Sequence, residues 1–283
     1  LVLATFGRGF YILDDYSALR QISADALQKE AALYPAKDAW MFIPKGELYG
    51  QGGTYYAGEN PPYGAVFTYY LKEAPKTKEE ARHENEKELF KAGKPIPMPT
   101  EAELRAEAQE EKPYLVFTVA DETGQVVRRL TAKAEKGIHR LAWDLRYPAL
   151  SPISDGERAR GRGEGRSGIL AMPGKYRVSM AICADGKLKE LAGPVEFSAE
   201  VLRNTTLPVA DRAELVAFQK SAAEMARSIQ GAQRLAEEMA RQVAAMKKAV
   251  QLTPAASPAL LDRVRAAEKE LDDILFAFQG KKP

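Results

Sequence analysis

In the run YRVSMAIC, residues 176–183, large apolar or aromatic side chains alternate with polar or small ones. Successive side chains of a β-strand point to opposite faces, so the four large residues of this run share one face. Alternation of this kind is typical of an antiparallel strand with one face on a core and the other in water. Cys183 is the one cysteine of the chain, and we expect a small, half-buried hydrophobe there.

Strand-like segments recur outward from this run. They occupy residues 65–71, 114–119, 125–130, 138–145 and 195–201. Turn sequences separate some neighbours, namely Asp121-Glu122-Thr123-Gly124 and Asp185-Gly186. Within 138–145, Leu141, Trp143 and Leu145 fall on one face, so we expect Trp143 in the core. Short strands at this spacing predict an antiparallel β-sandwich over residues 63–207.

The first sixteen residues have a different pattern. Leu1–Thr5 and Phe10–Leu13 are apolar runs on either side of Gly7-Arg8-Gly9, which predicts a β-hairpin. Its arms lack polar alternation, as in strands that are covered on both faces. By itself such a hairpin is expected to be sticky and poorly protected, and deleting residues 1–16 should improve solubility. Since the chain starts at Leu1 without a signal peptide, we expect a piece of a longer protein.

Residues 17–62 read as an irregular connector with a short helix near 24–32. Six aromatic residues are expected to anchor this connector on neighbouring surfaces: Tyr34, Trp40, Phe42, Tyr49, Tyr55 and Tyr56. Two insertions interrupt the sandwich. Residues 72–112 hold eleven Glu, seven Lys and two Arg, which indicates two charged, solvated helices around a proline linker, or else disorder. Residues 155–168 mix arginines with glycines, which favours a mobile surface loop over an anion-binding loop.

The last segment, residues 208–283, has helical periodicity. Asp211 is a candidate N-cap, with Glu214 three residues later. Apolar or small residues then follow at alternating spacings of three and four: Phe218, Ala222, Met225, Ile229, Ala232, Ala236, Met239, Val243, Met246 and Val250. Prolines at 254 and 258 break the pattern before a second helix. The segment predicts an antiparallel helical hairpin packed along this seam. Its methionines leave a partner-binding or oligomerisation surface as an alternative.

The sequence offers little for catalysis. Its two histidines, His83 and His139, lie in different segments, and no nucleophile-elbow, zinc-protease, dinucleotide or P-loop motif occurs. The adjacent Asp14-Asp15 would point to opposite faces, and Asp144 is expected to bond to nearby backbone or to Arg146. We predict no catalytic residue, no cofactor and no metal site in this chain.

The overall composition excludes other classes. Apolar residues make up 45% and charged residues 28%, as in ordinary folded proteins. Lys and Arg number 41 against 39 Asp and Glu, a net charge of +2, so there is no case for a nucleic-acid partner. No apolar stretch approaches about 18 residues, so no membrane span is expected.

Three motifs resemble one known family. Residues 3–15, LATFGRGFYILDD, resemble the A-T-H-G-R-G-F-x-I-L-D-D segment that ends the propeller of sortilin-like, neuraminidase-repeat (BNR) proteins. These are large secreted bacterial β-propellers, often labelled glycosyl hydrolases. Phe6 stands where that family has His. Residues 33–42 and 60–71 are similar to its L-F-P-P-R-x-A-x-R-F and N-P-P-x-G-A-x-x-x-Y-x-L stretches.

Two further motifs resemble the family's C-terminal Ig-like module, which is also similar to the Ig-like domain of flagellar hook-capping proteins. They are Trp143-Asp144-Leu145-Arg146-Tyr147 and Pro173-Gly174-Lys175-Tyr176-Arg177-Val178. The resemblance implies an Ig-like or fibronectin-like sandwich and a fold that is mainly β with α. It also implies structural roles for nine residues: Gly7, Gly9, Asp15, Trp143, Asp144, Arg146, Pro173, Gly174 and Tyr176.

The resemblance also implies an organisation. Residues 1–16 would be the last strands of a truncated propeller, whose blades would lie upstream because no S-x-D-x-G-x-T-W repeat occurs here. The expected function is a non-catalytic structural or interaction region of a periplasmic or extracellular bacterial protein. Its partners would be the upstream propeller domain and a protein or glycan.

The alternative is an accessory, carbohydrate-binding part of a sialidase-like glycoside hydrolase, and the resemblance leaves the activity of the parent protein open. Exposed aromatic residues separate the two readings. Sugar binding needs a row of solvent-facing Trp or Tyr, whereas a structural module buries them.

Overall fold

The computed structural model describes residues 1–7, 9–42, 60–149, 168–202 and 211–280. The chain divides into two compact units, which are described separately. One unit comprises Leu1–Pro148 and Leu170–Ala210, and the other comprises Ala149–Ile169 and Asp211–Pro283. Helices account for about 40% of the residues and strands for about 31%. The longest helix spans 41 residues. The predicted combination of a β-sandwich and a C-terminal helical pair is confirmed.

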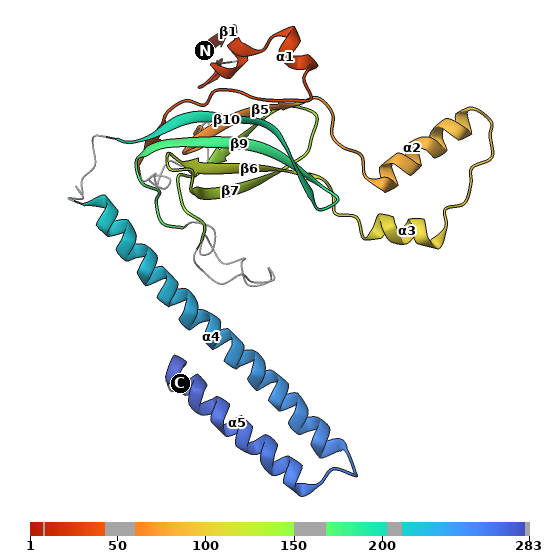
Figure 1. The fold of residues 1–283 in the computed structure, drawn as a ribbon, viewed down its shortest axis with the longest axis vertical. Coiled ribbons are helices and arrows are strands. Elements are labelled where there is room, and N and C mark those ends of the chain that lie inside the picture. Colours follow the sequence, from red (N-terminus) through yellow and green to blue (C-terminus); the bar gives the residue numbers. More distant parts are fainter. Residues whose placement is uncertain (8, 43–59, 150–167, 203–210, 281–283) are drawn as a thin grey trace. The chain divides into compact units, whose positions relative to one another are not determined.

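The first unit contains a sandwich of two sheets (Figure 1). The five-stranded sheet has the order β4 (Ala39–Met41), β10 (Lys187–Val201), β9 (Gly174–Ala184), β6 (Tyr114–Asp121) and β7 (Val126–Lys133). The three-stranded sheet has the order β3 (Ala31–Leu33), β5 (Ala65–Leu71) and β8 (Gly137–Trp143). Neighbours pair antiparallel, apart from the parallel pair β4–β10.

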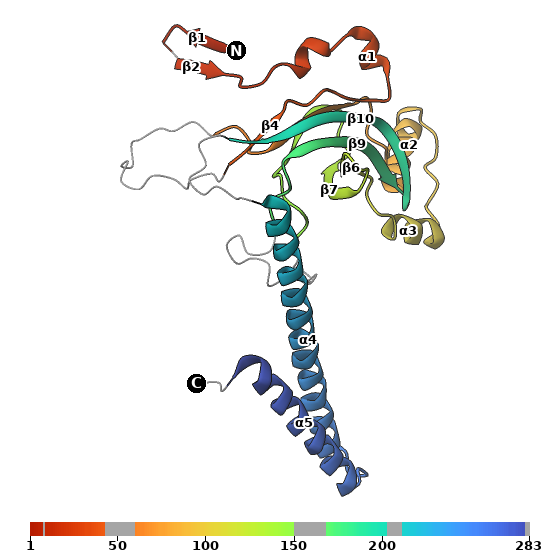
Figure 2. The same ribbon diagram turned by 60° about the vertical axis from the view of Figure 1, so that its left-hand side comes forward.

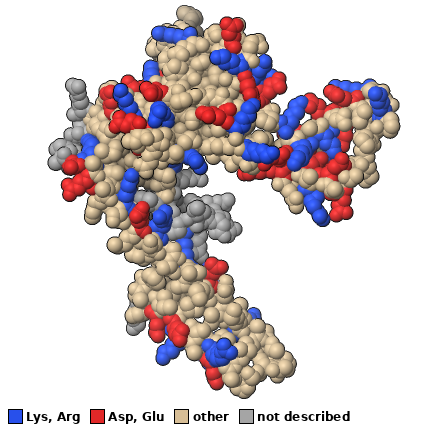
Figure 3. Space-filling view, in the orientation of Figure 1, with Lys and Arg blue, Asp and Glu red and all other residues tan. Residues whose placement is uncertain are grey.

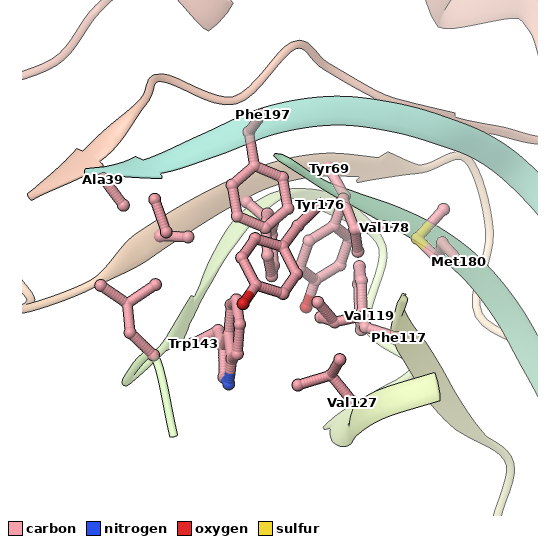
Figure 4. Close-up of a cluster of buried hydrophobic side chains, with 14 of the residues drawn as sticks. Ala39, Tyr69, Phe117, Val119, Val127, Trp143, Tyr176, Val178, Met180 and Phe197 are labelled. Carbon is pink, nitrogen blue, oxygen red and sulfur yellow. The ribbon is translucent and has the colours of Figure 1, made fainter. Parts of the chain in front are cut away.

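The core lies between the two sheets (Figure 4). The four alternating large residues of β9 are all buried, as the sequence predicts. Aromatic rings join the sheets: Phe67 of β5 meets Phe197 of β10 with centroids 5.3 Å apart, and Tyr69 of β5 meets Phe117 of β6 at 4.9 Å. Fully burying each large side chain stabilises the fold by roughly 1.5–3 kcal/mol, so this cluster is the main source of stability in the unit.

The turn between β6 and β7 shows how local chemistry fixes the register. The Asp121 carboxylate accepts hydrogen bonds from the Thr123 hydroxyl and from the N–H groups of Thr123 and Gln125. These bonds, the Thr123 hydroxyl first, lower the pKa of Asp121 below its ordinary value. The predicted turn at residues 121–124 is therefore present, closed by the side chain of its first residue.

Several boundaries differ from those the sequence predicts. The connector 17–62, expected to be irregular, contributes β3 and β4 to the two sheets. The short helix expected at 24–32 ends early: a 3-10 helix Ala18–Gln21 precedes α1 (Ala24–Gln28), and Ala31 already pairs with Leu71. Main-chain pairing with β5 outweighs the local helical preference of these alanines.

Two strand boundaries also differ. The strand expected at 138–145 ends at Trp143, because Leu145 has a φ of 55° and leaves the sheet while staying buried. The closing strand, expected at 195–201, begins at Lys187, directly after the Asp185-Gly186 turn. The insertion at 155–168 lies almost wholly outside the described residues, as does the boundary expected at 207/208.

The predicted N-terminal hairpin is present as β1 (Val2–Thr5) and β2 (Gly9–Ile12), which pair antiparallel (Figure 2). All eight residues of its strands are exposed. Gly7 and Gly9 have φ values of 75° and 94°, the left-handed region that glycine enters most readily. Among the described residues, this two-stranded sheet has no third strand.

The charged insertion forms α2 (Lys78–Lys91) and α3 (Glu101–Ala108), as the sequence predicts. Thr77 and Thr100 each close a capping box, and neither helix has a buried residue. Arg82 pairs with Glu86 at 2.6 Å and with Glu107 of α3 at 2.7 Å. Figure 3 shows mixed positive and negative side chains over the insertion. The Arg82–Glu107 ion pair, rather than an apolar core, joins the two helices, and the capping boxes stabilise the start of each helix.

The second unit contains α4 (Arg212–Leu252) and α5 (Pro258–Gln279), the predicted helical hairpin. The Asp211 carboxylate accepts from the Glu214 N–H at 2.9 Å, so Asp211 is the N-cap. Lys247 pairs with Glu268 at 2.6 Å, and Gln279 donates to Glu237 at 2.8 Å. In the described part of the chain, no helix is long and apolar enough to cross a membrane.

Candidate interaction surfaces

Trp143 and Tyr176 form the centre of the sandwich core (Figure 4). Their rings lie edge to face with centroids 5.1 Å apart, and Phe197 stacks on Tyr176 at 5.9 Å. The Trp143 indole N–H donates to the Arg146 carbonyl at 2.9 Å, and the Tyr176 hydroxyl donates to the Met172 carbonyl. Ig-type sandwiches also have a buried core Trp and, separately, a Tyr whose hydroxyl bonds to backbone a few residues upstream.

Asp144 and Arg146 shape the turn after β8. The Asp144 carboxylate accepts from the Arg146 N–H at 3.2 Å, and Arg146 makes an isolated β-bridge with Leu170. The turn also requires Gly64, whose φ is 102° and whose Cα faces the Trp143 carbonyl so closely that a Cβ would lie 1.9 Å from that oxygen. These contacts fix the main chain of the turn, and none of them points a side chain into a cavity.

Asp15 joins the end of the hairpin to the sandwich. Its carboxylate accepts from the Ser17 N–H and hydroxyl and pairs with Lys37 at 3.2 Å, while Arg140 of β8 donates to its carbonyl. Burial opposes ionisation of this carboxyl, but the bonds from Ser17 and Lys37 outweigh it and lower its pKa. Asp15 therefore stays ionised as an anchor, while the neighbouring Asp14 is exposed.

The groups considered for catalysis lie apart. His83 is on α2, and His139 is on β8 with its Nε2 3.1 Å from the Lys136 carbonyl. Cys183 lies half-buried on β9, where its Cα pairs with that of Tyr114. Among the described residues, no three His, Cys, Asp or Glu side chains gather as metal ligands would.

The outer face of the five-stranded sheet carries an aromatic edge that the sequence does not single out. Ala39 and Met41 of β4 point into the core, so Trp40 points outward, with 50% of its surface exposed. Phe42 is also exposed and meets the Tyr63 ring edge to face at 4.9 Å. Of the six connector aromatics expected to anchor the segment, Tyr34 is buried, Trp40 and Phe42 are exposed, and Tyr49, Tyr55 and Tyr56 lie outside the described residues.

Polar groups border this edge. Trp40 pairs in register with Glu200 of β10, and Ser198 pairs with Lys175 of β9. These three polar residues line a shallow open depression together with Pro173, Gly174, Ala199 and Val201. Residues 39–42 are all apolar, so no polar–apolar alternation in the sequence could have placed Trp40 on an outer face. The result is a solvent-facing Trp beside a carboxylate, a hydroxyl and an ammonium group.

No protein-family model matches the chain. No curated protein matches it either. One similar solved structure is dimeric latent PorU from Porphyromonas gingivalis, with 12% identity and a TM-score of 0.26. The match covers 49% of this chain and 8% of that chain.

Proposed function

We propose that this chain is a non-catalytic C-terminal region of a secreted, sortilin-like, BNR-repeat β-propeller protein. Its hairpin β1–β2 supplies strands to the last propeller blade, and its sandwich and helical hairpin are structural or interaction modules. The proposal rests on the motif resemblance together with one observation, the exposure of every strand residue of β1–β2. A periplasmic or extracellular location follows from the same resemblance.

The hairpin has the surface of an incomplete sheet. Large apolar side chains are exposed on both faces, since adjacent strand residues alternate in direction: Val2, Leu3, Phe10, Tyr11 and Ile12. Strands that are apolar on both faces belong to sheets covered on both sides, as the inner strands of propeller blades are. An isolated two-stranded hairpin is marginal in water. Further strands and a neighbouring blade would complete it.

Hydrogen exchange tests this role. In the 283-residue chain, the amides of Val2–Ile12 should exchange much faster than those of Tyr176–Ile182. In the protein extended by the preceding blades, both sets should be strongly protected. Equal protection in the shorter chain, or no gain in the longer one, would overturn the proposal.

A matched pair of substitutions sharpens this test. Phe10 on β2 and Phe90 on α2 are 76% and 75% exposed. The two residues are therefore matched in this chain, and the proposal predicts that only Phe10 becomes buried in the extended protein. Phe10→Ala should lower the melting temperature of the extended protein and leave that of the 283-residue chain unchanged. Phe90→Ala should change neither.

The second candidate is the carbohydrate-binding role. The aromatic edge at Trp40 supports it, because a solvent-facing indole stacks on apolar sugar faces while neighbouring polar groups bond to hydroxyls. Trp40 and Trp143 are the two tryptophans of the chain, and Trp143 is fully buried. A change in tryptophan fluorescence on adding a sugar therefore reports on Trp40.

Titration with a panel of neutral and sialylated oligosaccharides tests this candidate. Binding measured by isothermal titration calorimetry, which does not depend on the Trp40 signal, should be saturable and should disappear in Trp40→Ala, whereas Phe90→Ala should bind normally. No saturable change with any oligosaccharide, or equal binding by Trp40→Ala, would remove the candidate.

A further inference from the structure

Helix α5 lies along one half of α4. The ion pair Lys247–Glu268 and the bond from Gln279 to Glu237 show that α5 runs antiparallel to α4 and ends beside Glu237. Helix α4 has 41 residues and α5 has 22, so their lengths are about 62 and 33 Å at 1.5 Å per residue. The N-terminal half of α4, residues 212–235, therefore extends past the end of α5 (Figure 1).

A second apolar line runs the whole length of α4. Residues toward α5, such as Ala236, Val243 and Val250, are buried or half-buried. Another set recurs at every seventh position and is exposed: Phe218, Met225, Ala232, Met239 and Met246. Residues seven apart lie nearly above one another on a helix. This exposed line, which we call the α4 stripe, is separate from the contact with α5.

Helix α5 has a matching line. Leu260, Ala267 and Ile274 are also seven apart, and Leu260 and Ile274 are exposed. On both helices a stripe residue comes four positions before a contact residue, as Met239 precedes Val243 and Ala267 precedes Leu271. Because the helices are antiparallel, the same rotation from each contact line brings both stripes to the same side of the hairpin. The two stripes therefore border one open groove of the hairpin.

The charge pattern marks the α4 stripe for burial. From residue 221 on, the positions that flank it on the side away from α5 are uncharged, namely Ser221, Ser228, Leu235, Gln242 and Ala249, and the one charged residue on this line is Glu214 in the first turn of α4. Between Phe218 and Met246 the charged residues lie at other positions: Lys220, Glu224, Arg227, Arg234, Glu237, Glu238 and Arg241. A solvated helix face would carry charges throughout, so this face has the composition of an interface core.

The stripe is symmetric about Ala232. Phe218 and Met246 are equidistant from Ala232 in sequence, and so are Met225 and Met239. In an antiparallel pair of α4 helices with a two-fold axis at Ala232, Phe218 meets Met246 of the second copy and Met225 meets Met239. The small alanine lies on the axis, where the two helices approach each other.

The same axis explains why α5 is short. The second copy's α5 would lie beside residues 212–227, the part of α4 that its own α5 leaves uncovered. By its ion pair and hydrogen bond with α4, each α5 lies beside about sixteen residues of α4, 237–252 in its own copy and 212–227 in the second copy, so two α5 helices cover most of the 41 residues of α4. Each end of the assembly is then a three-helix bundle of α4, α5 and the N-terminal half of the other α4, seated in the groove.

The available area suits a stable dimer. Eight large residues contribute, each between 38% and 70% exposed. Six belong to the stripes: Phe218, Met225, Met239, Met246, Leu260 and Ile274. The other two, Leu215 and Ile229, continue the contact line of Ala236 into the half of α4 that the second copy's α5 would cover. At about 150–200 Å² for a fully exposed large side chain, these eight residues present roughly 700 Å² per copy. Stable interfaces bury about 800 Å² per partner. We propose that the α4–α5 hairpin is a homodimerisation module, which pairs antiparallel with a second copy of this chain.

The mass of the full chain in solution, measured by sedimentation or light scattering, tests the proposal. We expect a dimer that Phe218→Glu or Met225→Glu converts to a monomer, raising the dissociation constant at least 100-fold. Phe276→Glu is the matched control, because Phe276 is 60% exposed on α5 but lies off the stripe. It should remain dimeric. Equal helix content by circular dichroism in all variants shows that α4 and α5 stay folded.

Cross-linking tests the register in a Cys183→Ser background. A short bis-maleimide should join two copies of the Ala232→Cys variant, where the axis passes. It should not join two copies of Gln251→Cys, because positions 251 of the two copies would lie about 57 Å apart. A monomer at every concentration, a dimer unaffected by Phe218→Glu, or cross-linking at position 251 would each overturn the proposal.

Discussion

The hairpin β1–β2 and the pair β6–β9 are both antiparallel strand pairs rich in apolar residues, yet they lie in opposite environments. In β9, large apolar or aromatic residues alternate with polar or small ones, and every one of these apolar or aromatic residues is buried. In β1–β2 the apolar residues are consecutive, and every strand residue is exposed. Between these two pairs, alternation rather than apolar content distinguishes the strand with a buried face from the exposed ones. The exposed apolar faces of β1–β2 are the basis of the proposal that further strands cover them.

The largest effect that separates the two regions is expected at Trp143. Trp143→Ala removes a fully buried side chain that contacts Tyr176 and Phe197, so unfolding free energy should fall by about 3–5 kcal/mol. Denaturant unfolding followed by circular dichroism measures this loss. Trp40→Ala, a change of the same residue type on the outer face, should cost less than about 1 kcal/mol. An unchanged stability in Trp143→Ala would refute the core role.

Two glycine substitutions compare the backbones of the same regions. Gly64→Ala places a Cβ against the Trp143 carbonyl at a φ of 102°, so it should destabilise the sandwich by roughly 1–3 kcal/mol or more. Gly7 has a φ of 75°, but no heavy atom lies within 4 Å of the Cβ that Gly7→Ala would add. This substitution should strain only the hairpin turn and leave the global transition in place. Equal shifts of the two midpoints would contradict this difference.

A smaller effect depends on pH. Burial raises the pKa of Tyr176 above its ordinary 10.0, so the folded state keeps the phenol proton at pH values where the unfolded state loses it. The contribution of this phenol to the unfolding free energy is therefore fully present below pH 10. Above pH 10 the unfolding free energy falls, by up to about 1.4 kcal/mol at pH 11.

Tyr176→Phe should reduce the fall in unfolding free energy between pH 8 and pH 11 by about that amount. The same change should cost about 1 kcal/mol at pH 8, through loss of the bond to the Met172 carbonyl. Tyr11→Phe, in the exposed hairpin, is the control for loss of a phenol hydroxyl, and it should leave the stability at pH 8 unchanged. An identical alkaline slope for Tyr176→Phe would contradict the assignment.

The smallest effect on stability is expected from removing the hairpin. A chain without Leu1–Leu13 keeps the Asp15–Lys37 ion pair and every sandwich strand, so its unfolding free energy should change by less than about 0.5 kcal/mol. Its solubility should rise, because an exposed apolar surface and two open strand edges are lost. A clear drop in the stability of the sandwich would show that the hairpin is part of its core.

Periodicity and capping in the sequence determined most of the elements. The strand at 65–71 has the predicted bounds, the charged insertion forms two capped helices, and Asp211 begins the long helix. These features depend on residues close together in the chain, where side-chain direction repeats every two or 3.6 residues. The same local patterns predicted which face of β9 is buried.

Other features were decided by the tertiary structure alone. Residues 31–33 and 39–41 become strands because β5 and β10 offer main-chain partners, which no local pattern announces. Trp40 became part of an exposed edge only when β10 fixed which way β4 faces. The α4 stripe became visible only when α5 took one side of the seam and left the other exposed. The sequence by itself sets the spacing of apolar residues, but the choice of partner for each face depends on distant segments, whose apolar surfaces compete for the same burial.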